Sequence, residues 1–428
     1  MPAMPPATPP VPSGLDLAPF HGLRYADADI AAVTAPPYDV IDDAARARLE
    51  ARDEHNVVRL ILPRDTDGAE GSRYREAARL LQHWTEVGVL ARDDEAALYV
   101  YEESVEGHVQ RGLLGALALA PFDAGIVLPH ENTMAGVVAD RLALMEATEA
   151  DLEPIFLVYD GAGGAAASAV EKASADTPMA EATTEDGVTH RLWAITDPGT
   201  LEAVRADLLP RKAVIADGHH RYTTYLQRQA ARHAAGDGPG PWDRGLVLLV
   251  DTSSFGPQVH AIHRVIAELA LDDAVERARP GFSVSAVDDG EPDQLLAFLA
   301  GVPGHAFLLS DGTEHWLLHD PDPTRLDTAL PPGRSDAWRG LDVSVAHHLL
   351  IRGLWGLDDG EQVVGFEHDA AAAMRAAAQA DGTALLLNPT PVGAVSAVAA
   401  ADDRMPRKST LFTPKPRSGL VMRTYADS

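Results

Sequence analysis

The segment 216–222, Ala-Asp-Gly-His-His-Arg-Tyr, combines the residue types of a phosphate-binding turn. An apolar run precedes it and a helix-forming stretch follows, so we expect it at a strand-to-helix junction. The Asp is a suitable N-cap, the Gly permits a tight turn, and the free N–H groups of a helix start bind phosphate. The Arg adds a two-pronged donor, and the His pair can exchange protons. The predicted phosphate-binding residues are Asp217, Gly218, His219, His220 and Arg221. The alternative is a capped helix with surface histidines.

A second candidate site is the Pro-bounded segment 129–133, Pro-His-Glu-Asn-Thr. A carboxylate in such a loop can act as general base and bind a cation, so Glu131 is the predicted base, with His130 as a further catalytic candidate. Arg141, at the start of the next predicted helix, is expected to stabilise charge on a phosphate. The alternative is an ordinary Glu131–Arg141 salt bridge beside an exposed histidine.

The third candidate is the basic stretch 404–417. Residues 404–420 contain five basic and no acidic side chains, whereas the whole chain has a net charge of −29. A local positive patch in an acidic protein attracts anions. Lys408 and Ser409 are therefore predicted to contact phosphate. The alternatives are a basic strand that neutralises acidic neighbours and a free tail, and the Gly-rich half of a Walker A motif is missing.

Asp39 completes the set of candidates. It follows Pro36-Pro37-Tyr38, and proline rings make this turn rigid. A carboxylate fixed there can orient a substrate hydroxyl or amine. The alternative is an Asx-turn without a chemical role.

Composition excludes several classes of protein. The chain of 428 residues has no cysteine, which rules out disulfide scaffolds, Cys-ligated metals and a catalytic thiol. Its 64 acidic residues against 35 basic ones disfavour nucleic-acid binding. No apolar run reaches the length of a membrane span and the N-terminus does not resemble a secretory signal, so we expect a cytoplasmic protein without membrane contact.

Hydrophobic patterning predicts the elements that must hold these residues. Strands are expected at 55–62, 97–103, 111–122, 154–160, 213–217, 246–251 and 259–266, and helices at 73–84, 139–150, 219–235, 342–355 and 370–380. Because strands and helices alternate without a regular βαβ rhythm, the fold class is predicted as α+β, with mixed sheets and flanking helices. We expect a disordered Pro-rich tail at 1–14, a core domain at 15–240 and a C-terminal α+β region at 241–428.

The order of motifs resembles the family called domain of unknown function 1015 (DUF1015). The matching pieces are FHGLRY, APPYDVI, NVVRLILP, LYVYEE, PHENT, ADRLALMEAT, PIFLVY, ADGHHRY, HRVI, LDVSVAHHLL and MPRKSTLFTPKPRSGL. The DGHHR turn itself resembles the phosphate-binding turn of the ParB/sulfiredoxin-like fold. That resemblance implies a nucleotide-binding core to which the segment 404–420 returns, and a relation to kinases of free L-serine. A sulfiredoxin activity is excluded because the chain has no cysteine.

The function expected from this reading is phosphorylation of a small hydroxylated metabolite, free L-serine at the level of the resemblance. ATP or ADP would be the phosphate donor and Mg²⁺ the metal, with Glu131 as a ligand. The expected partners are a nucleotide and a small molecule, and the oligomeric state is left open. A second hypothesis is a nucleotide-binding regulatory switch without phosphate transfer. A third, a metal-dependent hydrolase, lacks a His-Glu-x-x-His motif.

Overall fold

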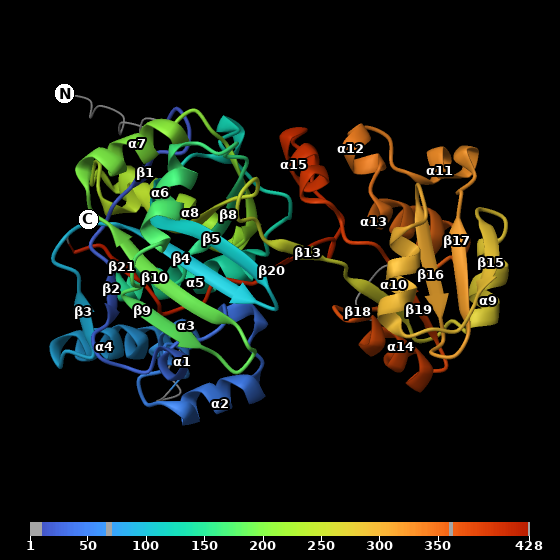
Figure 1. Cartoon of the computed structure of the whole chain (residues 1–428), viewed down its shortest axis with the longest axis horizontal. Helices are drawn as coiled ribbons and strands as arrows, with labels where there is room; N and C mark the ends of the chain where they lie inside the picture. The colour runs from blue at the N-terminus through green and yellow to red at the C-terminus, as the bar shows by residue number, and fades with distance from the viewer. Residues whose placement is uncertain (1–10, 66–70, 359–362, 427–428) are drawn as a thin grey trace. The chain divides into compact units, whose positions relative to one another are not determined.

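The computed structural model describes residues 11–65, 71–358 and 363–426, so residues 1–10 of the Pro-rich segment lie outside it. Its internal contacts form two compact units, which are Met1–Pro257 together with Pro414–Ser428, and Gln258–Thr413 (Figure 1). This division differs from the boundary expected at residue 240. The reason is β12 (Arg244–Asp251), which pairs with β5 (His108–Ala118) and β8 (Ile155–Tyr159) and so belongs to the sheet of the first unit.

The first unit is built on a nine-stranded mixed sheet. Its strand order is β6-β11-β8-β12-β5-β4-β10-β9, and β1 pairs with β5 in addition. Within this sheet, strands β6 and β11 pair in parallel, as do strands β8 and β12. All other strand pairs of the sheet are antiparallel. The strands not yet bounded are β1 (Leu17–Ala18), β4 (Leu98–Val105), β6 (Val127–Leu128), β9 (Ala180–Thr183), β10 (Thr189–Ile195) and β11 (Ala213–Asp217). The mixed sheet confirms the predicted α+β class.

Helices flank this sheet, and their apolar side chains share a core with it. They are α5 (Ala135–Thr148), α6 (Ala165–Ser174), α7 (Pro198–Leu208) and α8 (His219–Ala235). Leu157, Ile215 and Leu249 from three central strands are buried beside Val204 of α7 and Tyr222 of α8. The sheet therefore provides a rigid base for the turn between β11 and α8.

The N-terminal part of the unit has its own small core. It contains α1 (Ile30–Val33), α2 (Asp43–Arg52), α3 (Val58–Ile61), α4 (Ser72–Glu86), and the two-stranded sheet of β2 (Leu23–Tyr25) and β3 (Leu90–Arg92). The strand predicted at 55–62 is wrong, because these residues form α3. Asn56 explains the difference: its side-chain oxygen accepts a hydrogen bond from the Val58 N–H at 2.9 Å and thereby starts a helical turn.

The second unit contains a six-stranded antiparallel sheet of order β15-β17-β16-β19-β14-β18. Its strands are β14 (His263–Ile266), β15 (Ser283–Val287), β16 (Ala306–Ser310), β17 (His315–His319), β18 (Val364–Glu367) and β19 (Thr383–Leu386). A separate ribbon pairs β13 (Gln258–His260) with β20 (Leu411–Thr413), so the strand predicted at 259–266 is divided in two.

The helices of the second unit are α9 (Leu271–Ala278), α10 (Pro292–Ala300), α11 (Pro323–Ala329), α12 (Asp336–Arg339), α13 (Asp342–Val345), α14 (Ala370–Gln379) and α15 (Val392–Ala400). A π-helix, Ala346–Leu354, continues α13. His347 of this π-helix is buried. Across the described ranges, no helix has the length and hydrophobicity needed to cross a membrane.

Candidate phosphate-binding site

The predicted strand-to-helix turn is present in the first unit. Strand β11 ends at Asp217, Gly218 has the left-handed conformation with φ 96°, and α8 begins at His219. A side chain at position 218 would be strained, which explains why the turn needs glycine. Gly218 has no side chain with which to cap the helix, and backbone N–H groups at a helix start can donate to phosphate. The helix dipole adds positive potential at the same point.

Asp217 lies between two cations. Its carboxylate accepts hydrogen bonds from Arg221 and from Lys415 Nζ, both at 2.6 Å. Burial by itself raises the pKa of this carboxyl, but the charges of Lys415 and Arg221 outweigh burial, so the pKa lies below its ordinary value. The same contacts keep Lys415 charged, because Asp217 and Asp39 raise its pKa against the effect of burial. The turn is thus a charge-balanced cluster at neutral pH.

Arg221 is held by the protein rather than directed outward. It is 5% exposed, one terminal nitrogen donates to Asp217, and the other donates to the carbonyl of Pro154. Only its Nε lacks a hydrogen-bond partner. A two-pronged grip on phosphate, as expected from the sequence, would require the bonds to Asp217 and Pro154 to break. The geometry instead suits Arg221 to fixing the shape of the turn.

The Pro129–Thr133 loop lies against this turn through the two histidines. The backbone N–H of His130 donates to His219 Nε2 at 3.2 Å, and the two imidazole rings meet edge to face with centroids 4.6 Å apart. The Met134 N–H donates to His220 Nε2 at 3.1 Å. Burial lowers the pKa of His220, which favours the neutral ring that accepts this bond. The loop that carries Glu131 is therefore fastened to the start of α8.

Asp39 approaches the turn from a third segment. It lies in the 3₁₀ turn Tyr38–Val40, and its carboxylate is 3.4 Å from Lys415 Nζ. Glu153 fixes this 3₁₀ turn, because its carboxylate accepts a hydrogen bond from the Tyr38 N–H at 3.0 Å. The Tyr38 ring also lies under the Arg141 guanidinium, 4.3 Å from its centroid. Asp39 itself keeps 39% of its side-chain surface exposed, so a ligand can reach it.

Arg141 packs against Tyr38 in the turn that carries Asp39. It is 7% exposed and donates to the neighbouring Asp140 and to the carbonyl of Ile61. Its Nη1 atom lies 4.0 Å from an oxygen of the Glu153 carboxylate. The structure thus places Arg141 against Tyr38 and Glu153, which suits it to holding the Asp39 turn.

The basic stretch 404–417 is divided between the two units. Lys415 and Arg417 belong to the first unit, where Lys415 bonds to Asp217 of the turn and Arg417 bonds to Thr34. Lys408 and Ser409 belong to the second unit, where the Lys408 carbonyl accepts a hydrogen bond from Arg264 at 2.9 Å. Ser409 is 2% exposed and donates to the carbonyl of Pro406. Arg404, at the start of the stretch, pairs with Asp402 at 3.4 Å in the same unit.

Three functional candidates were not predicted as site residues. Lys415 was noted only as part of the basic stretch, and Tyr38 and Glu153 were not assigned. The scarcity of lysine, four in 428 residues, was a signal for Lys415. No sequence signal marks Glu153, because its role depends on Tyr38 and on Ser418, which donates to it at 3.0 Å from the far end of the chain.

The arrangement can bind an anion at the start of α8, with an ammonium group and a partly exposed carboxylate beside it. Within the described ranges, no group of three or more His, Asp or Glu residues is placed to hold a metal ion. A metal at this site would therefore need oxygen ligands from a bound nucleotide, which is how Mg²⁺ commonly binds in proteins.

Comparison with known proteins gives distant structural likenesses. SbnI with a C-terminal truncation, from Staphylococcus aureus, aligns at a TM-score of 0.35 and 11% identity over 72% of this chain and 87% of that one. A free serine kinase in complex with AMP aligns at 0.31 and 14%, over 69% and 88%, and a variant of it with ADP at 0.32 and 13%, over 69% and 88%. Identity and TM-score are both low, so we base the proposals below on the residues of the site.

Sequence comparison gives a firmer result. A search among curated proteins finds no match. The family model described as "Protein of unknown function (DUF1015)" matches residues 17–344, which include the turn, the Pro129–Thr133 loop and Asp39. The match covers more than half of the 428 residues. The chain belongs to the DUF1015 family.

Proposed function

We propose that the protein is a nucleotide-dependent phosphotransferase that acts on a small hydroxylated metabolite. The observation that carries the proposal is the position of Lys415, whose ammonium group lies between Asp217 and Asp39 at the uncapped start of α8. Phosphoryl transfer requires a phosphate cradle, a cation and a carboxylate that positions the hydroxyl. The start of α8, Lys415 and Asp39 are the candidates for these three parts. The resemblance of the DGHHR turn implies a ParB/sulfiredoxin-like core and free L-serine as acceptor.

The cradle consists of the N–H groups at Gly218, His219 and His220, supported by the helix dipole. Lys415 faces the phosphate that is transferred and stabilises its charge. Asp39 orients the acceptor hydroxyl and takes its proton. The acceptor oxygen then forms a bond to the terminal phosphorus as the bond from that phosphorus to the bridging oxygen breaks, and the shortened nucleotide leaves with the bridging oxygen.

Mg²⁺ is expected to enter with the nucleotide. The carboxylates of Asp39 and Glu131 are the candidates to hold it together with phosphate oxygens, and the ion would neutralise charge on the phosphates. Glu131 also remains the alternative base if Asp39 serves the metal. Arg221 and Arg141 act on the turn and on Tyr38, so they are positioning residues in this scheme.

The test is direct. Purified protein is incubated with Mg²⁺ and either ATP or ADP, first with L-serine and then with a pool of hydroxylated metabolites, and products are followed by ³¹P NMR and mass spectrometry. We expect a new phosphate ester and an equal amount of shortened nucleotide. Nucleotide binding without any ester would support the regulatory switch instead. A chain that neither binds nucleotide nor forms an ester would refute the proposal.

A further inference from the structure

The last segment of the first unit carries the lysine of the site. We call residues 414–418 the C-terminal strap. Lys415 is its functional residue, with Nζ 2.6 Å from Asp217 and 3.4 Å from Asp39. A lysine side chain has four rotatable carbon–carbon bonds, and ordering it costs up to about 2 kcal/mol of entropy. Its placement therefore depends on how firmly the backbone on either side is held.

Hydrogen bonds fasten the strap on both sides of Lys415. On the near side, the Pro414 carbonyl accepts from Gln110 Nε2 at 3.2 Å. On the far side, the backbone N–H of Arg417 donates to the Tyr101 hydroxyl at 3.3 Å. Gln110 and Tyr101 lie on neighbouring strands β5 and β4 of the main sheet. Each flank of Lys415 is thus tied to the rigid sheet rather than to another loop.

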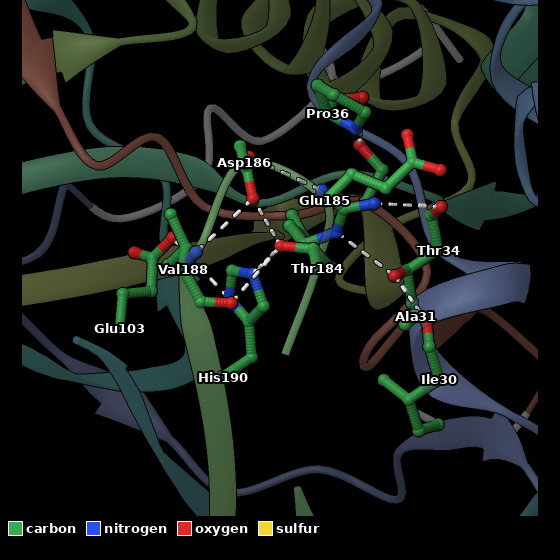
Figure 2. A network of polar contacts seen from close by, with 12 residues as sticks. Ile30, Ala31, Thr34, Pro36, Glu103, Thr184, Glu185, Asp186, Val188 and His190 are labelled. Carbon is green, nitrogen blue, oxygen red and sulfur yellow. Dashed lines mark hydrogen bonds and ion pairs between the residues drawn. The ribbon is translucent and has the colours of Figure 1, made fainter. Parts of the chain in front are cut away.

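The Arg417 side chain adds a third attachment. Its Nε donates to Thr34 Oγ1 and a terminal nitrogen donates to the Thr34 carbonyl, both at 3.0 Å. Thr34 is buried and ends α1. The segment that begins there leads directly to Tyr38 and Asp39, so Arg417 connects the strap to the chain that supplies the carboxylate of the site. Figure 2 shows Thr34 and Pro36 beside the hairpin that carries Asp186 and His190.

The anchors Gln110 and Tyr101 are themselves held by a buried polar cluster, of which Figure 2 labels Glu103, His190 and Thr184. Gln110 Nε2 donates to Glu103 at 2.6 Å, and the Tyr101 hydroxyl bonds to His190 Nδ1 at 2.8 Å. The other ring nitrogen of His190 is 3.1 Å from Thr184 Oγ1 in the β9–β10 hairpin. All five side chains are buried, so none can change rotamer without breaking a bond.

We infer that Gln110, Tyr101 and Arg417 are positioning residues that hold Lys415 against Asp217 and Asp39. Their contribution to catalysis rests on the proposed function, but the placement itself can be measured without substrate. Loss of an anchor frees the strap backbone, and the ammonium group then loses its fixed distance to both carboxylates. None of the three anchors contacts the start of α8 in the described structure.

Competitive amine labelling measures this placement. The chain has only four lysines, and Lys172, Lys212 and Lys408 are exposed whereas Lys415 is 19% exposed. The folded protein is treated with trace acetic anhydride near pH 8, and acetylation of each lysine is quantified by mass spectrometry. In the native chain we expect Lys415 to react more slowly than Lys172, because only the free amine is acetylated and the Lys415 ammonium group is largely buried and paired with Asp217 and Asp39.

The decisive variants are Arg417→Met and Gln110→Met. In both, acetylation of Lys415 should approach that of Lys212 while the other three lysines keep their native rates. Arg417→Lys, which keeps the charge but not the two-bond fork, should restore part of the protection. Arg423→Met is the matched control, because Arg423 is equally buried near the chain end but bonds to Asp151. It should leave Lys415 protected.

A folded Arg417→Met chain and a folded Gln110→Met chain that both keep Lys415 protected would overturn the inference. So would a native Lys415 that reacts like Lys172. In the active enzyme, loss of an anchor should lower kcat more than it raises KM for nucleotide, because the N–H cradle is intact. If the native chain shows no nucleotide binding, the proposed function fails, and the labelling result still decides the placement of Lys415.

Discussion

Arg221 in the first unit and Arg264 in the second are both buried, and each follows a histidine, yet their surroundings differ. Arg221 pairs with the Asp217 carboxylate at 2.6 Å, and although burial lowers its pKa, Glu153 and Asp217 raise it overall. Arg264 is 0% exposed and donates to the carbonyls of Ile262 and Lys408, with no carboxylate within ion-pair distance among the described residues. Burial lowers the pKa of Arg264 to about 9.

Arg221 belongs to a cluster of balanced charges, whereas Arg264 holds backbone segments together through their carbonyl groups. Beside Arg221, the Asp39 side chain is 39% exposed and that of Lys415 is 19% exposed, so a ligand can reach this cluster. Arg264 is surrounded by carbonyl groups and by His347, which lies 3.1 Å away, and it fastens the backbone of Lys408. A histidine-arginine pair in the sequence is therefore not sufficient to identify a phosphate site. The neighbouring Asp and Gly distinguish the two.

The largest effect is expected from Asp39→Asn, which removes the carboxylate at the site but keeps its shape. General acid–base catalysis contributes about 10²–10⁴-fold in rate, so kcat should fall by that order while nucleotide affinity changes little. Steady-state kinetics with a calorimetric titration of nucleotide separates the two quantities. Glu131→Gln is the comparison variant. If Glu131→Gln loses the rate and Asp39→Asn does not, Glu131 is the base.

Lys415→Met tests the cation of the first unit. Electrostatic donors at a developing charge are typically worth about 10²–10³-fold, and kcat should fall accordingly. Lys408→Met provides the contrast, since the contacts of Lys408 in the second unit are made by its backbone carbonyl. We expect the kcat of Lys408→Met to stay within about threefold of the native value, because this substitution removes no donor at the transferred phosphate. Loss of rate in Lys408→Met with a normal Lys415→Met enzyme would assign the phosphate contact to Lys408.

Stability should distinguish the two arginines. Arg221→Met breaks a buried ion pair, which typically costs about 3–5 kcal/mol. Arg264→Met removes a buried charge that has no counter-ion and leaves two carbonyls unpaired, so the loss should be nearer to about 1–2 kcal/mol. Urea denaturation followed by hydrogen exchange of peptides from β11 and β14 measures each unit separately. A larger loss for Arg264→Met would show that Arg264 carries more stabilisation than its contacts indicate.

The sequence alone predicted the parts of the fold that depend on local pattern. The strand before the DGHHR turn and the helix after it are both confirmed. The strand at 55–62 was wrong because the apolar pattern of a short buried segment fits a helix and a strand equally, and the Asn56 side chain decided between them. The Asn56 amide also donates to the carbonyls of Ala32 and Thr34, and local pattern could not reveal those tertiary contacts.

The site could be predicted only where its residues lie in one segment. The turn and the adjacent histidines were recognised, but the contact between Lys415 and Asp217 joins residues almost two hundred positions apart. Glu153 and Thr34 have roles that arise from the returning strap and carry no motif of their own. Such pairings depend on which strands become neighbours in the sheet, and hydrophobic periodicity does not determine that order.

Glu103 extends the comparison to a buried acid. Like Arg264 it lacks a charged partner, since His190 at 3.9 Å has its pKa lowered to about 3 by burial and is neutral. Burial raises the pKa of Glu103 from 4.5 to about 8. The folded chain therefore binds a proton that the unfolded chain releases. The stability from this proton is complete below about pH 4.5 and declines as pH rises toward 8.

Glu103→Gln mimics the protonated acid, so it removes this pH dependence. At pH 7.5 the variant should be more stable than the native chain by about 1–3 kcal/mol, and the difference should shrink toward zero near pH 5. Thermal or urea unfolding across this pH range measures the difference. Equal stability of the two chains at every pH would show that Glu103 is ionised in the folded state and paired in another way.

Binding of nucleotide phosphates at the start of α8 underlies the proposed function. The most direct measurement is a TROSY NMR titration of the ¹⁵N-labelled chain with MgADP and, separately, with adenosine. We expect saturable shifts of the Gly218, His219 and His220 amides with MgADP. These shifts should be strongly weakened in Lys415→Met, and adenosine should cause none of comparable size. Saturable MgADP binding that shifts amides elsewhere and leaves these three unchanged would contradict phosphate binding at the start of α8.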